Sequence, residues 1–236
     1  MIKKCLLTGA VCMLVLLAGC SGNPQEKVSV PSESIQQSSE EPQRDMDAIV
    51  RKAFSDLWKS DVIYIDAEMT VEETEVSESK SVYRYIIAAD GKKKSAALEI
   101  EQQDTEKVHC IIRDNVLYRI NDEGKSYTTE EYKGKIEDFV KAYTKDMNLS
   151  ETSMSREDTG LTPFNGQKEI EFVKYRIAVE SGSDKITVTY YLKDEKPYAE
   201  VMQSERGKTT ILFRSLTNKI ADKTIFEVPE DYENLS

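Results

Sequence analysis

Apolar residues recur at helical spacing in two segments of the chain. In residues 45–59 they fall on one stripe of a helix, with charged residues between them: Met46, Ile49, Val50, Ala53, Phe54, Leu57 and Trp58. A second stripe follows at i, i+3, i+4, i+7 and i+11: Ile136, Phe139, Val140, Tyr143 and Met147. Stripes of this kind predict amphipathic helices. We therefore expect two helices, each packed by its apolar side against the rest of the fold.

Between and after these segments the apolar period changes from about 3.6 to two. The first such run alternates apolar and polar residues from Ile63 to Glu72, and similar runs follow as far as Phe213. Alternation is typical of β-strands with one face buried and the other in water. Turn sequences such as Asp90-Gly91 separate the runs. The pattern predicts an α+β fold with an antiparallel sheet of about 10–11 strands and two or more covering helices.

Two stretches depart from this pattern. The segment from Asn148 to Asn165 is polar and without period, so we expect it to be irregular and the most mobile part of the domain. The segment from Ile225 to Tyr232 is predicted to be a last strand, stopped by Pro229. Proline has no N–H to donate to a sheet, so it belongs at a strand end or an edge strand.

A sheet that is apolar on one face has to bury that face. Two helices are few for so many strands, so the sequence leaves two alternatives open, a filled core or an apolar cavity. The apolar sides of three strands are the candidate lining of such a cavity. These candidates are Ile177, Val179, Val188, Tyr190, Ile211 and Phe213. A cavity with few polar groups would accept acyl chains.

The N-terminus has the layout of a secretory signal: Lys3 and Lys4, then an apolar run, then Leu17-Ala18-Gly19-Cys20. The final tetrapeptide resembles the bacterial lipobox. That resemblance implies a diacylglyceryl group on the sulfur of Cys20 and cleavage before it; the alternative is an ordinary secreted protein cut after Gly19. We expect a signal peptide in residues 1–19, a lipidated disordered tether in 20–44 and one domain in 45–236.

The net charge and the cysteine content limit which partners and which covalent bonds we expect. The formal net charge is −11, and it becomes −13 without Lys3 and Lys4. An acidic domain of this kind does not bind nucleic acid through phosphate contacts. It does not adhere to anionic lipids by charge, so membrane attachment would rest on the acyl anchor. Cys110 is the only cysteine after Cys20, so a disulfide within the domain is not expected.

The sequence carries no recognisable catalytic motif. His109 is the only histidine, and we find no His-x-Glu motif, no His-Glu-x-x-His motif and no Ser-His-Asp triad. We expect His109 to be an exposed strand residue and Cys110, on the opposite face, to be buried. The acidic run around Glu72 to Glu78 lacks the spacing of a calcium loop. We expect no enzyme activity, no metal site and no cofactor.

The order of elements and the last third of the chain resemble the bacterial lipoprotein-carrier superfamily, the LolA/LolB-like and LppX-type proteins. The resemblance rests on Lys196-Pro197 in a turn and on an ending with Phe226, Val228, Pro229 and Tyr232. It implies a strongly curved antiparallel sheet, an incomplete barrel with helices across its mouth. It also implies that the space between sheet and helices takes acyl chains.

Two functions follow as hypotheses. The first is an envelope lipoprotein, anchored at the outer side of the cell membrane, that binds lipid or a lipidated molecule. The second is a protein-interaction or sensor lipoprotein that uses the same scaffold, with an unknown protein partner and no lipid cargo.

Overall fold

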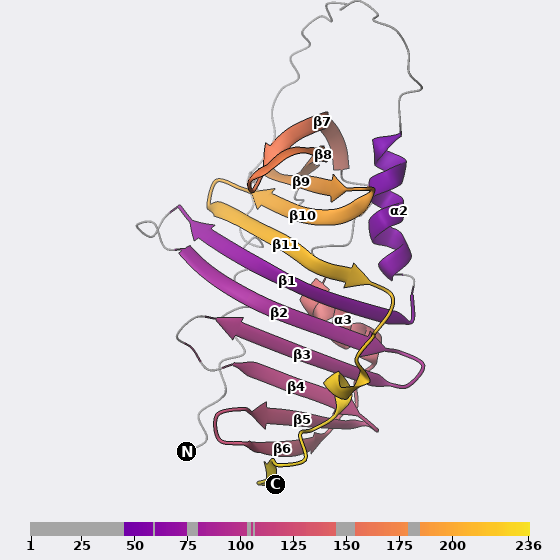
Figure 1. Ribbon diagram of the computed structural model, residues 1–236, viewed down its shortest axis with the longest axis vertical. Coiled ribbons are helices and arrows are strands. Elements are labelled where there is room, and N and C mark those ends of the chain that lie inside the picture. Colours follow the sequence, from indigo (N-terminus) through magenta and orange to yellow (C-terminus); the bar gives the residue numbers. More distant parts are fainter. Residues whose placement is uncertain are drawn as a thin grey trace, which may run out of the picture.

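In the part of the chain that the structure describes, one large open sheet carries two helices on the same side (Figure 1). The computed structural model describes residues 45–58, 60–74, 80–102, 105, 107–144, 154–178 and 185–236. The predicted α+β class is confirmed. The expected signal peptide and tether lie outside the described residues, as does Cys20, so their assignment stays a prediction.

The helices are α2 (Met46–Trp58) and α3 (Ile136–Thr144), close to the predicted positions. The carboxylate of Asp45 accepts a hydrogen bond from the backbone N–H of Ala48 at 3.1 Å, as an N-cap does. Acidic side chains at Glu137 and Asp138 lie in the first turn of α3, where they complement the helix dipole. Local sequence therefore defines where both helices begin.

Within the described residues the sheet has twelve strands, against the 10–11 predicted. In chain order they are β1 (Val62–Glu73), β2 (Lys80–Asp90), β3 (Ser95–Gln102), β4 (Val108–Arg113), β5 (Val116–Asn121), β6 (Ser126–Glu131), β7 (Met154–Phe164), β8 (Gln167–Ala178), β9 (Lys185–Lys193), β10 (Lys196–Gln203), β11 (Gly207–Thr217) and β12 (Glu233–Asn234).

The spatial order is β12-β6-β5-β4-β3-β2-β1-β11-β10-β9-β8-β7. Two meanders, β1 to β6 and β7 to β11, are joined where β1 pairs with β11. All pairs are antiparallel except that of β12 with β6. The order does not close on itself, so the sheet is an open one, and β7 and β8 curl over at its upper end (Figure 1). We call the side that faces α2 and α3 the inner face and the other side the outer face.

The expectation of an irregular segment from Asn148 to Asn165 is wrong for its larger part, because Met154–Phe164 forms β7. Among the described strands it pairs with β8 alone, which makes it an edge of the sheet. Most of its side chains are exposed, so burial imposes no apolar alternation on the sequence. Pro163 stands at a register shift between Thr162 and Phe164, a position that an edge strand tolerates. Residues 148–153 lie outside the described part.

The predicted final strand from Ile225 to Tyr232 is also wrong. A single turn of 3-10 helix occupies Lys223–Phe226, and the short strand β12 follows only after Pro229. Asp222 caps the turn by accepting a hydrogen bond from the backbone N–H of Thr224 at 2.9 Å. The segment 218–236 crosses the outer face of β2 to β6, whereas α3 lies behind the sheet (Figure 1). We call this segment the C-terminal strap.

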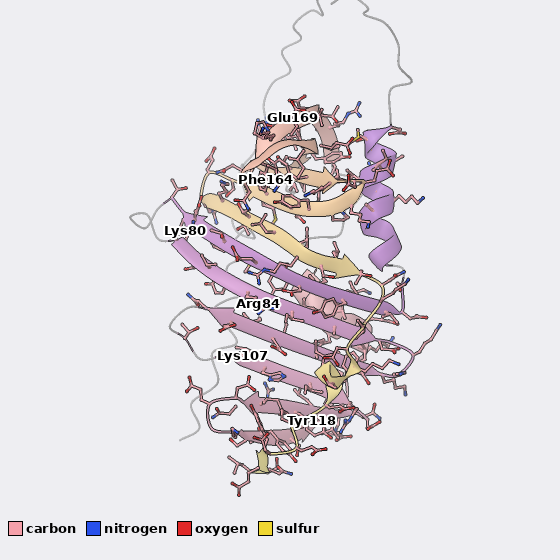
Figure 2. The ribbon with its side chains drawn as sticks, viewed as in Figure 1. Lys80, Arg84, Lys107, Tyr118, Phe164 and Glu169 are labelled. Carbon is pink, nitrogen blue, oxygen red and sulfur yellow. The ribbon has the colours of Figure 1, made fainter. Side chains whose placement is uncertain are left out.

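The strap covers an outer face that the strand pattern predicts to be wet. Ala88, Ala97, Ile111 and Ile120 are buried there together with Phe226 of the strap. Register places Ala88, Ala97 and Ile111 in one row across three strands, and their small or branched side chains leave room for the phenyl ring. The half-buried Tyr64, Tyr118 and Tyr127 surround them, and Figure 2 shows Tyr118 on this face. This half of the sheet is thus buried on both faces.

A polar network fastens the end of the strap to the sheet. Tyr232 donates a hydrogen bond from its hydroxyl to Asp122 at 2.9 Å, and Nδ1 of His109 lies 3.1 Å from the same carboxylate. Lys107 bridges Asp122 and Glu99 at 3.2 and 2.7 Å. The expectation of an exposed His109 is therefore wrong: its side chain is 10% exposed. It does lie on the face opposite Cys110, which is buried as expected.

This network predicts a pH dependence. Burial alone would raise the pKa of Asp122, but hydrogen bonds with His109, Tyr232 and Lys107 outweigh burial and hold that pKa below its usual range. A carboxyl group whose pKa is lower in the folded protein than in the unfolded chain stabilises the fold. This stabilisation is complete above the pKa in the unfolded chain, near 3.9, and is lost as the pH falls through the pKa in the folded protein. We expect Asp122→Asn to unfold more easily than wild type at neutral pH, by about 1 kcal/mol for so exposed a group. Urea denaturation should show the difference shrinking below about pH 4; a difference independent of pH would contradict the account.

Candidate functional site

The inner face carries a continuous apolar layer that contains the residues predicted from strand alternation. Val188, Tyr190, Ile211 and Phe213 are buried in one cluster, each with less than a tenth of its surface exposed. Ile177 is half-buried and packs against the same cluster. Val179 lies outside the described residues. The layer extends from Cys110 and Ile112 in β4 to Val173 and Tyr175 in β8, which means that most of the sheet contributes to it.

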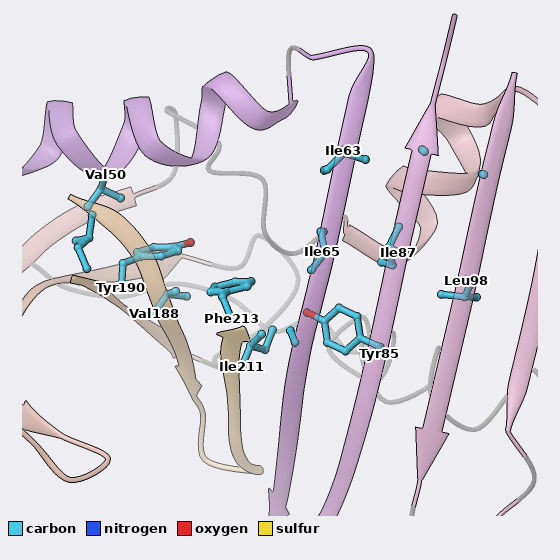
Figure 3. Close-up of a cluster of buried hydrophobic side chains, with 14 of the residues drawn as sticks. Val50, Ile63, Ile65, Tyr85, Ile87, Leu98, Val188, Tyr190, Ile211 and Phe213 are labelled. Atoms are coloured by element: carbon cyan, nitrogen blue, oxygen red, sulfur yellow. The ribbon is translucent and has the colours of Figure 1, made fainter. Parts of the chain in front are cut away.

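The two helices cover this layer. α2 lies against β1, β8 and β10, and α3 lies against β2 and β3. Their contribution consists of the apolar stripes seen in the sequence: Met46, Ile49, Val50 and Ala53 from α2, and Ile136, Phe139 and Val140 from α3. Figure 3 shows Val50 directed from α2 toward Tyr190 and Val188. The apolar stripe of α2 thus packs directly on the predicted residues.

Burial decreases along the strands toward one end of the sheet. In β1, Ile65 and Ala67 are fully buried, whereas Met69 and Val71 are half-buried. In β2, Ile87 and Tyr85 are buried and Tyr83 is half-buried. The same end of the inner face carries half-buried apolar residues on six strands, and we call these the apolar rim: Met69, Ile100, Val108, Ile177, Ile186 and Met202. It is the end where β1 connects to β2, β3 to β4, β8 to β9 and β10 to β11.

A hydrogen bond fastens the first turn of α2 to the far half of the sheet. The hydroxyl of Tyr175 donates to Oδ1 of Asp47 at 2.6 Å, and Arg156 lies 3.4 Å from the other carboxylate oxygen. Burial, followed by the bond to Asp47, raises the pKa of Tyr175, so the phenol stays protonated. Its ring meets that of Tyr190 edge-on, with centroids 6.0 Å apart. The helix therefore has a defined position over β8 and β9.

Two polar groups that the sequence analysis missed lie inside the apolar layer. Glu200 in β10 has no exposed surface, and register places it between Tyr190 and Ile211 on the inner face. Tyr85 is 7% exposed, and its hydroxyl has no hydrogen-bond partner among the described residues. Burial, and then the charge of Glu200, raise the pKa of both Tyr85 and Tyr190. Both phenols are therefore neutral donors.

Comparisons with known proteins find similarity at the level of structure. No protein-family model and no curated protein matches the sequence. The chain is similar to the crystal structure of LprF from Mycobacterium bovis, with a TM-score of 0.46, 8% identity and coverage of 81% of this chain and 99% of that one. It is also similar to the crystal structure of the lipoprotein LppX from Mycobacterium tuberculosis, with a TM-score of 0.44, 9% identity and coverage of 74% of this chain and 96% of that one. The crystal structure of an uncharacterised conserved protein from Thermus thermophilus is similar with a TM-score of 0.42, 10% identity and coverage of 81% of this chain and 99% of that one. At these values the likeness carries no inference about ligands.

The described residues offer little for other chemistry. They contain no group of three or more His, Cys, Asp and Glu side chains placed to hold a metal ion. None of their helices has the length and apolar character of a bilayer span. What the inner face offers is apolar surface, flexible methionine side chains at its rim and one buried pair of polar groups.

The two inner-face tyrosines should respond differently to loss of their hydroxyls. We expect Tyr85→Phe to leave the free energy of unfolding unchanged or to raise it by up to about 1 kcal/mol, because it removes a buried hydroxyl that has no partner. Tyr175→Phe should lower it by about 1–2 kcal/mol, because Asp47 loses its donor. Urea denaturation of the two matched variants measures this. A larger loss in Tyr85→Phe than in Tyr175→Phe would show that Tyr85 has a partner in solution.

Proposed function

We propose that this protein is a lipid-anchored cell-envelope protein that binds the acyl part of a lipid, or of a lipidated molecule, between the inner face and its two helices. One observation carries the proposal. The apolar layer does not end where the helices end: it continues to a rim of half-exposed apolar side chains on six strands. A contiguous apolar surface that reaches solvent in this way is typical of a binding site.

The physical chemistry of the layer favours an acyl chain. Each methylene that leaves water contributes about 0.8 kcal/mol, so a long chain supplies enough free energy to displace side chains of α2 or α3. Both helices are short, with 13 and 9 residues, and the hydrogen bond of Tyr175 holds only the first turn of α2. Methionines at the rim, Met69 and Met202, have unbranched side chains that adapt to ligands of irregular shape.

The second part of the proposal concerns the place of the protein in the cell. The lipobox-like sequence ending at Cys20 supports a diacylglyceryl anchor, and residues 20–44 would be a tether of about 25–30 Å on average. Acyl chains of this kind give stable attachment when two or more are present. The domain would then work at the extracytoplasmic face of the cell membrane, held near the lipid that it binds.

Titration with a dansylated fatty acid tests the lipid site. We expect wild type to bind the probe, and Met69→Glu on the rim to weaken binding at least about tenfold, because a carboxylate replaces apolar contact at the entrance. Val82→Glu is the matched control: it lies near the same end of the sheet but on the outer face and is 38% exposed. Equal loss in both variants, or no binding by wild type, would contradict the proposal.

Native mass spectrometry of the full chain purified from cells distinguishes the two functions. Lipid that copurifies in stoichiometric amount supports the lipid-binding function. A stoichiometric protein partner without lipid, together with no binding of the fatty-acid probe, would overturn it in favour of a protein-interaction or sensor lipoprotein.

The anchor has its own test. We expect Cys20→Ala to move the protein from the membrane fraction to the soluble fraction and to abolish incorporation of a labelled fatty acid, since only a thiol there can form the thioether. Cys110→Ala is the control, because Cys110 is buried and should keep the label unchanged. Label that persists on the Cys20→Ala variant would refute the lipobox assignment.

A further inference from the structure

Tyr85 of β2 directs a hydroxyl group into the apolar layer of the inner face. Register places it between Ala67 of β1 and Ile100 of β3, so the three side chains project from the same face. Ala67 is small and leaves room for the phenol ring to lean over β1, and Figure 3 shows the hydroxyl directed toward Ile211 of β11. Tyr85 therefore lies within the apolar layer, next to Ile100 of the apolar rim.

This hydroxyl has no hydrogen-bond partner among the described residues, although Tyr85 is only 7% exposed. Tyr175, which is also buried on the inner face, differs because its hydroxyl donates to Asp47. A buried hydroxyl that makes no hydrogen bond destabilises a folded domain, and phenylalanine would fill the same space without that cost. A tyrosine at this position therefore points to a ligand that supplies the missing partner.

The chemistry of the phenol restricts what that ligand can be. Burial raises the pKa of Tyr85, so its hydroxyl stays protonated and donates one hydrogen bond, which requires an acceptor. An ammonium group has no acceptor to offer. A carboxylate or phosphate would be buried without a countercharge, because no lysine or arginine of the described residues is buried. A carbonyl oxygen is a neutral acceptor and brings no donor of its own that would need a second partner.

Resting on the proposed function, we propose that the lipid bound on the inner face carries a carbonyl group within its chain, as an ester or a ketone, and that Tyr85 donates a hydrogen bond to the carbonyl oxygen. The carbonyl exchanges its hydrogen bonds with water for one with the phenol, and the phenol gains the partner that it lacks. An unsubstituted chain leaves this hydroxyl unpaired, so the site distinguishes the two kinds of chain.

The position of Tyr85 along its strand sets the depth of the carbonyl. β2 begins at Lys80, at the end of the sheet that carries the apolar rim, and Tyr85 is the sixth residue of this strand. At about 3.3 Å per residue this is roughly 16 Å of sheet. A lipid that enters past the rim and keeps its charged head group outside therefore places the middle of its chain, and not the atoms beside the head group, at Tyr85.

Competition against the dansylated fatty acid tests the inference on the full chain. The competitors are stearic acid, an oxostearic acid with its ketone in mid-chain, and a half-ester of a dicarboxylic acid of equal chain length with its ester in mid-chain. The quantity compared is the Kd of stearic acid divided by that of each carbonyl competitor. We expect this ratio to fall at least about tenfold in Tyr85→Phe, where the carbonyl is buried without a donor. A fall for one competitor alone assigns the group to the ketone or to the ester.

The infrared band of the ketone gives a second measurement, which wild type alone can decide. Hydrogen bonding lowers the stretching frequency of a carbonyl group, and an isotope label on the ketone carbon separates its band from that of the carboxyl group. The labelled oxostearic acid bound to wild type should show this band below the frequency measured in an alkane. In Tyr85→Phe the band should return to the alkane frequency. A band at the alkane frequency in wild type overturns the inference.

Controls separate the inference from the proposed function. Tyr85→Phe keeps the ring and should bind stearic acid at least as tightly as wild type. Tyr118→Phe removes a hydroxyl from the outer face and should leave both ratios unchanged. Ratios that are equal in wild type and Tyr85→Phe overturn the inference, because the phenol then does not contact the carbonyl, and they leave the proposed function standing. Failure of wild type to bind any of these acids or the dansylated probe overturns the proposed function itself.

Discussion

The Val188→Asp variant is expected to lose several kcal/mol of its free energy of unfolding and to be largely unfolded under conditions where wild type is native. Val188 is 1% exposed and lies at the centre of the inner-face cluster, where α2 covers it. A carboxylate at this position would be removed from water. The residues opposite it on the neighbouring strands are Tyr175 and Met202, and neither is a cation that could pair with it. Circular dichroism during urea denaturation measures the loss.

Two controls make the result specific. Val188→Ala removes volume without charge and should cost about 1–3 kcal/mol, less than the carboxylate. Thr189→Asp places the same charge one residue along, on the outer face, and should have a small effect. A Val188→Asp variant that folds but fails to bind the dansylated fatty acid would show that the layer hydrates when empty. A variant that folds and binds like wild type would show that Val188 does not lie in the ligand layer.

The second large effect is expected from Phe226→Ala, which should cost about 3–4 kcal/mol. Phe226 is the buried aromatic anchor of the C-terminal strap and packs on the outer face over Ala88, Ala97 and Ile111. Its loss leaves a cavity that alanines on a sheet cannot close. Thermal denaturation should show a lower midpoint. Limited proteolysis should cut within the strap before it cuts the sheet.

Ile225→Ala is the matched control, because Ile225 is adjacent but only half-buried against the same cluster. Its effect should be clearly smaller. If Ile225→Ala destabilised the protein as much as Phe226→Ala, or if neither variant changed proteolysis of the strap, the strap would not be held by Phe226.

The sequence predicted the elements that bury one face. Strands β1, β9 and β11 show clear alternation because water on the outer side permits polar residues there. The apolar members found in this way, such as Tyr190 and Ile211, proved to belong to one buried cluster. The helices were predictable for a similar reason, since each has one face on the sheet and one in solvent.

Three features could not be predicted from alternation: the buried outer face, the C-terminal strap and strand β7. Ala88-Ala89, Ala96-Ala97 and Ile111-Ile112 are adjacent apolar pairs, and such pairs signal a strand buried on both faces. They were the available sign that something covers the outer face. The identity of the cover could not be predicted, because the strap has no regular period and depends on contacts far away in the chain. Strand β7 lacked a signal altogether, since an edge strand is specified by backbone pairing.

Glu200 was hidden for a different reason. Its strand reads Tyr198, Glu200, Met202 on one side and Ala199, Val201, Gln203 on the other, so neither side is plainly apolar. Only the register with β9 and β11 shows that the glutamate shares a face with Tyr190 and Ile211. A polar residue inside an apolar layer is the kind of local inconsistency that sequence patterns assign to the surface.

An open sheet of this size could grow by adding strands from a second molecule, and its two edges decide whether it does. One edge is β12, which has only two residues to offer. The other is β7, interrupted by Pro163 and by register shifts after Arg156 and Thr162. Interrupted or very short edges resist the strand-to-strand association that leads to fibrils. If the proposed anchor concentrates the protein on a membrane surface, these edges would oppose association of neighbouring sheets, so the sheet could stay open without closing into a barrel.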